Sequence, residues 1–214
     1  MKNLSRLLLA FVLVLGYNYA DAQDKNNPWQ ITIGANAVDA YPSGDGGLFS
    51  ETIFDEFANA TDHYNILPSL STISVSKYIG DGFTFGVAGS LNKIDKWGDI
   101  SQGPDVTNEV DDLSYYGIDG TIKYNFLQGT TIDPYLGVGG GYTWVDEIGA
   151  GTLNGTAGFN IWFNDNIGFT LQTSYKHAFE DYLQTHFQHS AGISIKFGGT
   201  DTDGDGIYDK DDAC

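Results

Sequence analysis

The chain has 214 residues, with 28 acidic and 10 basic side chains, and carries a formal net charge of −18. So acidic a chain repels nucleic acid and anionic surfaces, which excludes nucleic-acid binding and favours divalent cations as partners. It has a single cysteine, Cys214, at the last position of the sequence.

The N-terminus indicates export. Lys2 and Arg6 precede an unbroken apolar run at residues 7–15, and a small-x-small cleavage site ends at Ala22. This pattern predicts a secretory signal peptide over residues 1–22. The apolar run is too short to span a bilayer, which takes about 20 residues, and no cysteine follows it to accept a lipid.

From Trp29 onward, apolar residues alternate with small or polar ones at a period of two, which is typical of β-strands. Each such segment is about 10 residues long, which matches a tilted strand that crosses a membrane. The sequence therefore predicts an all-β fold, an eight-stranded antiparallel up-and-down barrel. The predicted strands cover residues 29–37, 72–79, 83–92, 116–126, 135–144, 153–163, 167–175 and 187–197.

The composition of the two strand faces predicts which one points outward. A soluble barrel directs its apolar face inward and shows a charged surface. Here the non-apolar face consists of Gly, Ser, Thr, Asn and Gln with few charges, so we expect the apolar face to contact lipid and the small polar face to fill the lumen. Aromatic residues near strand ends are expected to form interfacial girdles: Trp29, Tyr78, Phe83, Phe126, Trp144, Phe163 and Phe197.

The connections alternate between short and long, as they do in an outer-membrane barrel with short periplasmic turns and long external loops. An even number of strands then places the C-terminus in the periplasm. The predicted turns are residues 80–82, 128–133 and 164–166, and the predicted loops are residues 39–68, 95–112, 146–151 (a short one) and 178–186.

The segment 199–214 forms a short acidic linker in which five aspartates occupy positions one, three, five, nine and twelve of a twelve-residue loop, with Gly206 at position six. This is the oxygen-ligand spacing of a calcium loop, in which position seven contributes its backbone carbonyl. A solvated acidic linker without metal is the alternative. The predicted calcium ligands are Asp201, Asp203, Asp205, the Ile207 carbonyl, Asp209 and Asp212, the last one carbon shorter than the usual glutamate.

The signal peptide, the eight alternating strands and the aspartate-glycine segment together resemble the N-terminal half of an OmpA-family outer-membrane protein, in the form found in Bacteroidetes-type bacteria. The tail is similar to a thrombospondin type 3 repeat, in which cysteines often tie neighbouring repeats, and this suits Cys214. The resemblance implies a signal peptide at 1–22, an outer-membrane barrel at 23–198 and a calcium-binding linker at 199–214.

The resemblance also implies a function. The barrel would anchor the protein in outer-membrane lipid, and a peptidoglycan-binding domain beyond residue 214 would hold the cell wall. The expected protein is structural rather than catalytic, with calcium as its cofactor and other outer-membrane proteins as further partners.

Three other functions compete with this one. An ion pore would use the inward candidates Asp119, Lys123, Lys176 and Lys196, but an eight-stranded barrel is narrow enough for side chains to fill, so we expect them to pair or to reach water at the rims. An accessory role in a larger assembly would use the lipid-facing wall or the first loop, where Phe49, Ile53, Phe54 and Phe57 suggest a short amphipathic helix. A barrel enzyme would use His177, Glu180, Asp181 and His186 near one predicted loop, without a nucleophile motif.

Overall fold

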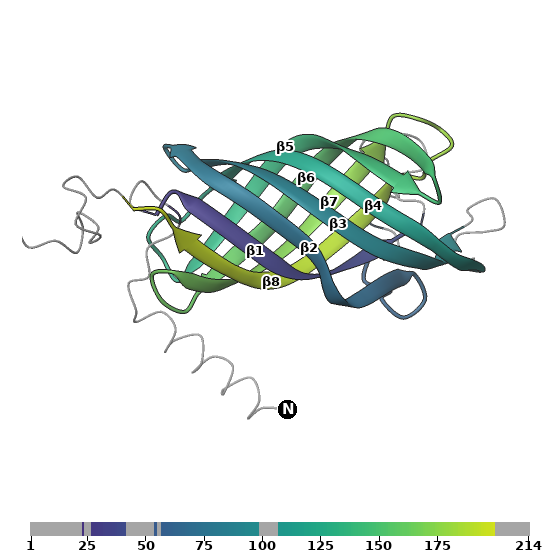
Figure 1. Cartoon of the computed structure of the whole chain (residues 1–214), viewed down its shortest axis with the longest axis horizontal. Coiled ribbons are helices and arrows are strands. Elements are labelled where there is room, and N and C mark those ends of the chain that lie inside the picture. Colours follow the sequence, from purple (N-terminus) through teal and green to yellow (C-terminus); the bar gives the residue numbers. More distant parts are fainter. Residues whose placement is uncertain (1–22, 24–26, 42–53, 55–56, 99–106, 200–214) are drawn as a thin grey trace, which may run out of the picture.

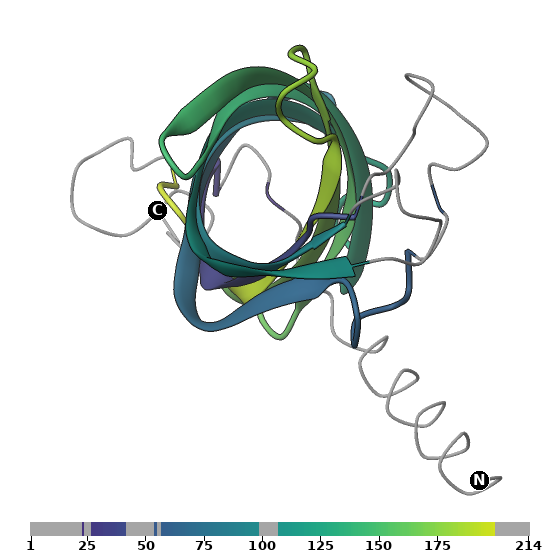
Figure 2. The ribbon, with the colours of Figure 1, turned by 90° about the vertical axis from the view of Figure 1, so that its right-hand side faces the viewer.

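The computed structural model describes residues 23, 27–41, 54, 57–98 and 107–199. Eight antiparallel strands follow one another around a closed barrel, and β1 pairs with β8 to complete the ring (Figures 1 and 2). The predicted fold class is confirmed. The strands are β1 (Trp29–Asp39), β2 (Tyr64–Gly80), β3 (Phe83–Gly98), β4 (Thr107–Asn125), β5 (Ile132–Val145), β6 (Ile148–Trp162), β7 (Ile167–Ala178) and β8 (His186–Phe197).

The barrel wall carries apolar side chains on the outside and polar ones inside. Val138 and Ile118 are 68% and 52% exposed, whereas the inward Thr143 and Ser194 are both 0% exposed. This is the reverse of a water-soluble barrel, and it confirms the predicted direction of the two faces. Within the described residues, no helix is long and apolar enough to cross a membrane.

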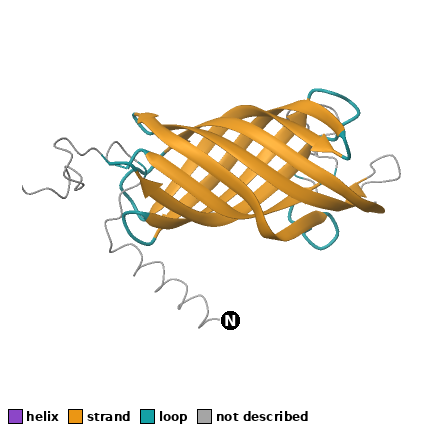
Figure 3. Ribbon diagram, viewed as in Figure 1, coloured by secondary structure: helices purple, strands orange, loops and turns teal. Residues whose placement is uncertain are grey.

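Most of the predicted girdle residues lie outward near the barrel ends, where the connections run (Figure 3). Trp29, Phe83, Phe126 and Phe197 are between 37% and 50% exposed around one end. Tyr78 differs, because it is half-buried and alternates with its exposed neighbours on β2. Its prediction as a girdle residue is therefore wrong, since the strand's alternation points it away from the outer surface.

Strands on one side of the barrel are longer than the alternation predicts. β2, β3 and β4 have 17, 16 and 19 residues. The predicted loops 39–68 and 95–112 are correspondingly too long, because β2 already pairs with β1 at Tyr64, and β3 and β4 continue to pair as far as Gly98 and Thr107. In this extension the exposed side chains are polar, as at Lys93 and Asp95, whereas Ile94 is 0% exposed within an apolar cluster, so the outward apolar alternation that marks the rest of each strand is absent from it.

The connection predicted at 146–151 is also shorter than expected. Asp146 and Glu147 alone join β5 to β6, and both have positive φ angles, of 46° and 71°. Two-residue hairpins favour this mirrored turn because its twist matches the twist of the strands.

Asparagine side chains form hydrogen bonds to the backbone where the register of the sheet shifts. The β1–β2 register shifts between Gly34 and Asn36, and the Asn36 Nδ2 donates to the Ser71 carbonyl at 2.8 Å. The Asn65 Oδ1 accepts from the backbone nitrogens of Asp95 and Lys96, each at 2.9 Å, at the β3–β4 irregularity. The side-chain amides therefore satisfy backbone groups that the bulges leave without strand partners.

Candidate functional site: the polar lumen

The lumen of the barrel is the candidate site, because the strands direct several charged side chains into it. Strand alternation sends Asp119 and Lys123 inward from β4, Lys176 inward from β7 and Lys196 inward from β8. They separate into two packed layers with a small chamber between them, so each layer is described in turn.

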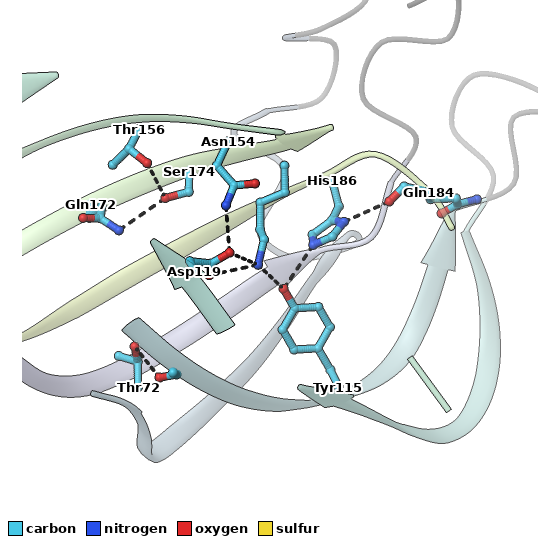
Figure 4. Close-up of polar contacts among 11 residues, drawn as sticks. Thr72, Tyr115, Asp119, Asn154, Thr156, Gln172, Ser174, Gln184 and His186 are labelled. Carbon is cyan, nitrogen blue, oxygen red and sulfur yellow. Dashed lines mark hydrogen bonds and ion pairs between the residues drawn. The ribbon is translucent and has the colours of Figure 1, made fainter. Parts of the chain in front are cut away.

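The first layer is an ion pair held by three further side chains (Figure 4). The Lys176 Nζ lies 3.0 Å from an Asp119 oxygen, and the two side chains are 0% and 14% exposed. The Asn154 Nδ2 donates to Asp119 at 2.7 Å, and the Lys176 Nζ donates to the Tyr115 hydroxyl at 3.3 Å. The Tyr115 hydroxyl is also 3.1 Å from the His186 Nε2. Four strands, β4, β6, β7 and β8, are thereby joined across the lumen.

Glycines make room for this layer. A Cβ added at Gly141 would lie 2.1 Å from the Asp119 Oδ1, and one at Gly117 would lie 3.1 Å from the Lys176 Nζ. A side chain at Gly141 would displace the Asp119 carboxylate, and one at Gly117 would crowd the Lys176 ammonium group. These glycines therefore leave room for the side chains that fill the lumen. The alternation of residues along the strands does not by itself predict this role.

The second layer lies toward the other end of the barrel. The Lys196 Nζ sits 3.9 Å from the centre of the Trp162 ring, a distance at which the ring face attracts a cation. The Asp133 Oδ2 accepts from Asn125 at 2.6 Å and from Asn160 at 3.4 Å. Asp133 and Lys196 are both buried, and they interact electrostatically.

Lys123 occupies the chamber between the layers. Its Nζ donates to the Gln172 Oε1 at 2.9 Å and lies 4.6 Å from the centre of the Tyr135 ring. Two cavities of about 40 and 30 Å³ adjoin it. Spaces of this size hold a few water molecules each. The lumen is therefore filled largely by side chains, as expected for an eight-stranded barrel.

The predicted pairing of the inward charges is confirmed for Asp119 with Lys176. Lys123 behaves differently, since its ammonium group contacts an amide oxygen and an aromatic ring. Lys196 packs on Trp162 within the Asp133 layer.

The structure does not assemble the predicted histidine and carboxylate cluster. His186 pairs across the sheet with the inward Lys176, whereas His177 points the other way and stacks near Tyr175 at 6.4 Å. The barrel wall therefore separates the two histidines, because neighbouring positions in a strand face opposite sides. Glu180 and Asp181 are exposed in the connection between β7 and β8.

The outer wall carries an aromatic cluster that the alternation of residues in the sequence does not predict. Phe187 alternates outward on β8 but is only 3% exposed, because Phe57 covers it at a ring distance of 4.9 Å and Phe54 at 6.1 Å. Tyr64 and His189 stack beside them at 4.7 Å. Phe54 and Phe57, both from the first connection, thus pack against the outside of the barrel, and no local signal at Phe187 could have indicated this cover.

The remaining predicted residues lie outside the described part of the chain. These are Phe49 and Ile53 of the suggested helix, the signal peptide at 1–22, and the calcium ligands Asp201, Asp203, Asp205, Ile207, Asp209 and Asp212.

Two solved structures share the barrel architecture. The N-terminal β-barrel domain of Pseudomonas aeruginosa OprF aligns with 81% of this chain and 100% of its own, at 11% identity and a TM-score of 0.51. Neisserial surface protein A aligns with 79% of this chain and 97% of its own, at 15% identity and a TM-score of 0.52. At these identities the likeness concerns the fold alone, which is the eight-stranded outer-membrane barrel. No protein-family model and no curated protein sequence matches the chain.

Proposed function

We propose that the protein is a structural anchor in a bacterial outer membrane. The inside-out surface carries this proposal, because a continuous apolar wall around a plugged polar lumen is stable only with hydrocarbon outside. The likeness to outer-membrane barrels supports the choice of membrane. A filled lumen favours an anchor over a small pore.

The tail suggests what the anchor holds. Calcium bound by residues 201–212 would offset the repulsion among the aspartates and stiffen a periplasmic spacer. The spacer would lead to a peptidoglycan-binding domain beyond residue 214, as the resemblance to OmpA-family proteins implies. Chemical cross-linking of intact cells, followed by isolation of cell-wall sacculi, tests the tether. The full-length protein should be retained on the sacculi, and a version ending after Phe197 should be lost from them.

The orientation is tested by labelling single cysteines on intact cells with a membrane-impermeant maleimide, in a Cys214→Ser background. Glu180→Cys lies in the β7–β8 connection and Asp165→Cys lies in the β6–β7 turn at the opposite end of the barrel. We expect Glu180→Cys to react and Asp165→Cys to react only after the cells are broken. The reverse pattern would place the C-terminus outside the cell and remove the tether.

Calcium binding by the tail is tested by calorimetry on the whole protein. We expect a dissociation constant of about 10⁻⁴ to 10⁻³ M, the usual range of extracellular calcium modules. Asp203→Ala and Asp205→Ala should weaken binding clearly, whereas Asp211→Ala lies off the ligand spacing and should change it little. Equal effects of all three substitutions would indicate an unstructured acidic linker.

A second candidate function, an accessory subunit of a larger membrane assembly, is favoured by one observation. A groove of about 440 Å³ lies in the outer wall between β1, β6, β7 and β8, and its lining includes the small residues Ala35, Ala157 and Ala191. A smooth depression of this kind allows close approach of another membrane segment. Purification in mild detergent followed by mass spectrometry tests it, and recovery of the barrel alone would speak against this role.

A further inference from the structure

The chamber around Lys123 has an unbalanced positive charge. In the described part of the chain, three lysines point into the lumen from β4, β7 and β8, namely Lys123, Lys176 and Lys196, but only two acids face them. Asp119 is bound to Lys176 at 3.0 Å, and Asp133 interacts with Lys196. Among the described residues, both acids are therefore engaged in the layers above and below Lys123.

The walls of the chamber offer hydrogen-bond donors. Lys123 lines both small cavities together with Thr72, Ser74 and Ser190. Hydroxyl groups can rotate to donate or to accept, so they adapt to the charge that they surround. Asp119 reaches the edge of the larger cavity, but Lys176 and Asn154 already hold its oxygens (Figure 4).

We propose that this chamber binds one small monovalent anion, such as chloride, between the Lys123 ammonium group and the surrounding hydroxyls. An ammonium group inside the barrel is stabilised by a counter-charge, and the amide oxygen of Gln172 supplies only a dipole. A cavity of about 40 Å³ accommodates a single small ion with little water and excludes larger organic anions. The anion completes the charge balance of the lumen, which the strands alone leave at one positive charge.

The position of the chamber sets how the ion exchanges. The Asp119–Lys176 layer borders the chamber, since Asp119 and Asn154 line its larger cavity, and the Asp133–Lys196 layer lies further along the lumen. An ion held between the two layers is a resident part of the folded barrel, and it exchanges by passing one of them.

The test compares heat unfolding of the detergent-folded protein in sodium chloride and in sodium gluconate at equal ionic strength. We expect a higher midpoint in chloride for the wild type and no difference for Lys123→Met. Lys93→Met is the matched control, because the Lys93 side chain is 62% exposed at the barrel rim, and it should keep the full chloride response. An equal chloride response in Lys123→Met and the wild type, or no response in the wild type, would overturn the proposal.

A second measurement covers the case in which Lys123→Met fails to fold. Crystals of the wild type grown in sodium bromide should show anomalous density within hydrogen-bond distance of the Lys123 Nζ. Water density at this position, without an anomalous signal, would show that the chamber is hydrated rather than occupied by an anion.

Discussion

Replacing Asp119 with alanine is expected to destabilise the folded barrel by about 3–5 kcal/mol, because it leaves the ammonium group of Lys176 buried without its counter-charge. The Lys176 side chain is 0% exposed, so solvent cannot replace the lost carboxylate. Urea unfolding of the protein in lipid vesicles measures the effect through the change in the midpoint.

Two further variants separate the ion pair from general damage to the lumen. The double variant Asp119→Ala with Lys176→Met removes both charges and should be more stable than Asp119→Ala alone. Lys93→Met breaks the pair between Lys93 and Asp112, whose side chains are 62% and 67% exposed, and should change the stability little. If the double variant is no more stable than Asp119→Ala, the loss comes from packing and not from an uncompensated charge.

Placing arginine at Val138 is expected to cost about 2–4 kcal/mol when the barrel is embedded in a bilayer. Val138 is 68% exposed in the middle of β5, so it would face hydrocarbon there. In a water-soluble barrel the same change at so exposed a site would cost almost nothing. The change in the free energy of unfolding in vesicles therefore shows whether hydrocarbon or water surrounds the barrel wall.

The neighbouring Gly139 provides a contrast. A Cβ at this position would lie 2.0 Å from the Gly120 carbonyl oxygen on the adjacent strand, so Gly139→Ala should impair barrel closure. Asp181→Arg, in an exposed connection, is the neutral control and should leave stability nearly unchanged. Tolerance of arginine at Val138 would argue against the membrane assignment.

The strand pattern was sufficient for the fold because each strand repeats the same information. Apolar residues at every second position mark the outer face, and the shortage of charge on the other face indicates that the barrel is inside out. The pattern ends where the exposed face becomes polar, which is why the extensions of β3 after Asn92 and of β4 before Tyr116 could not be predicted. Pro68 within β2 hints at a bulge, but the size of the register shift depends on Asn36 and Ser71 packing in the closed sheet.

The site was harder to predict than the fold. Inward lysines and aspartates can be identified from alternation, but which of them meet depends on the register around the whole ring. Asp119 and Lys176 are 57 residues apart and lie on strands that do not pair with each other. The burial of Phe187 could not be predicted for the same reason, because the Phe57 ring that packs on it belongs to a connection far away in the sequence.

The unequal strand lengths leave one strand edge open. β5 pairs with β4 only as far as Tyr115, so among the described strands the part of β4 before Ser114 pairs with β3 alone. An open edge invites another chain to add a strand and to aggregate. Glu109 and Asp111 are exposed along this edge, and Asp112 has a positive φ angle of 33° that interrupts its regular geometry. Charge and distortion at these positions therefore oppose the addition of a strand from another chain at this edge.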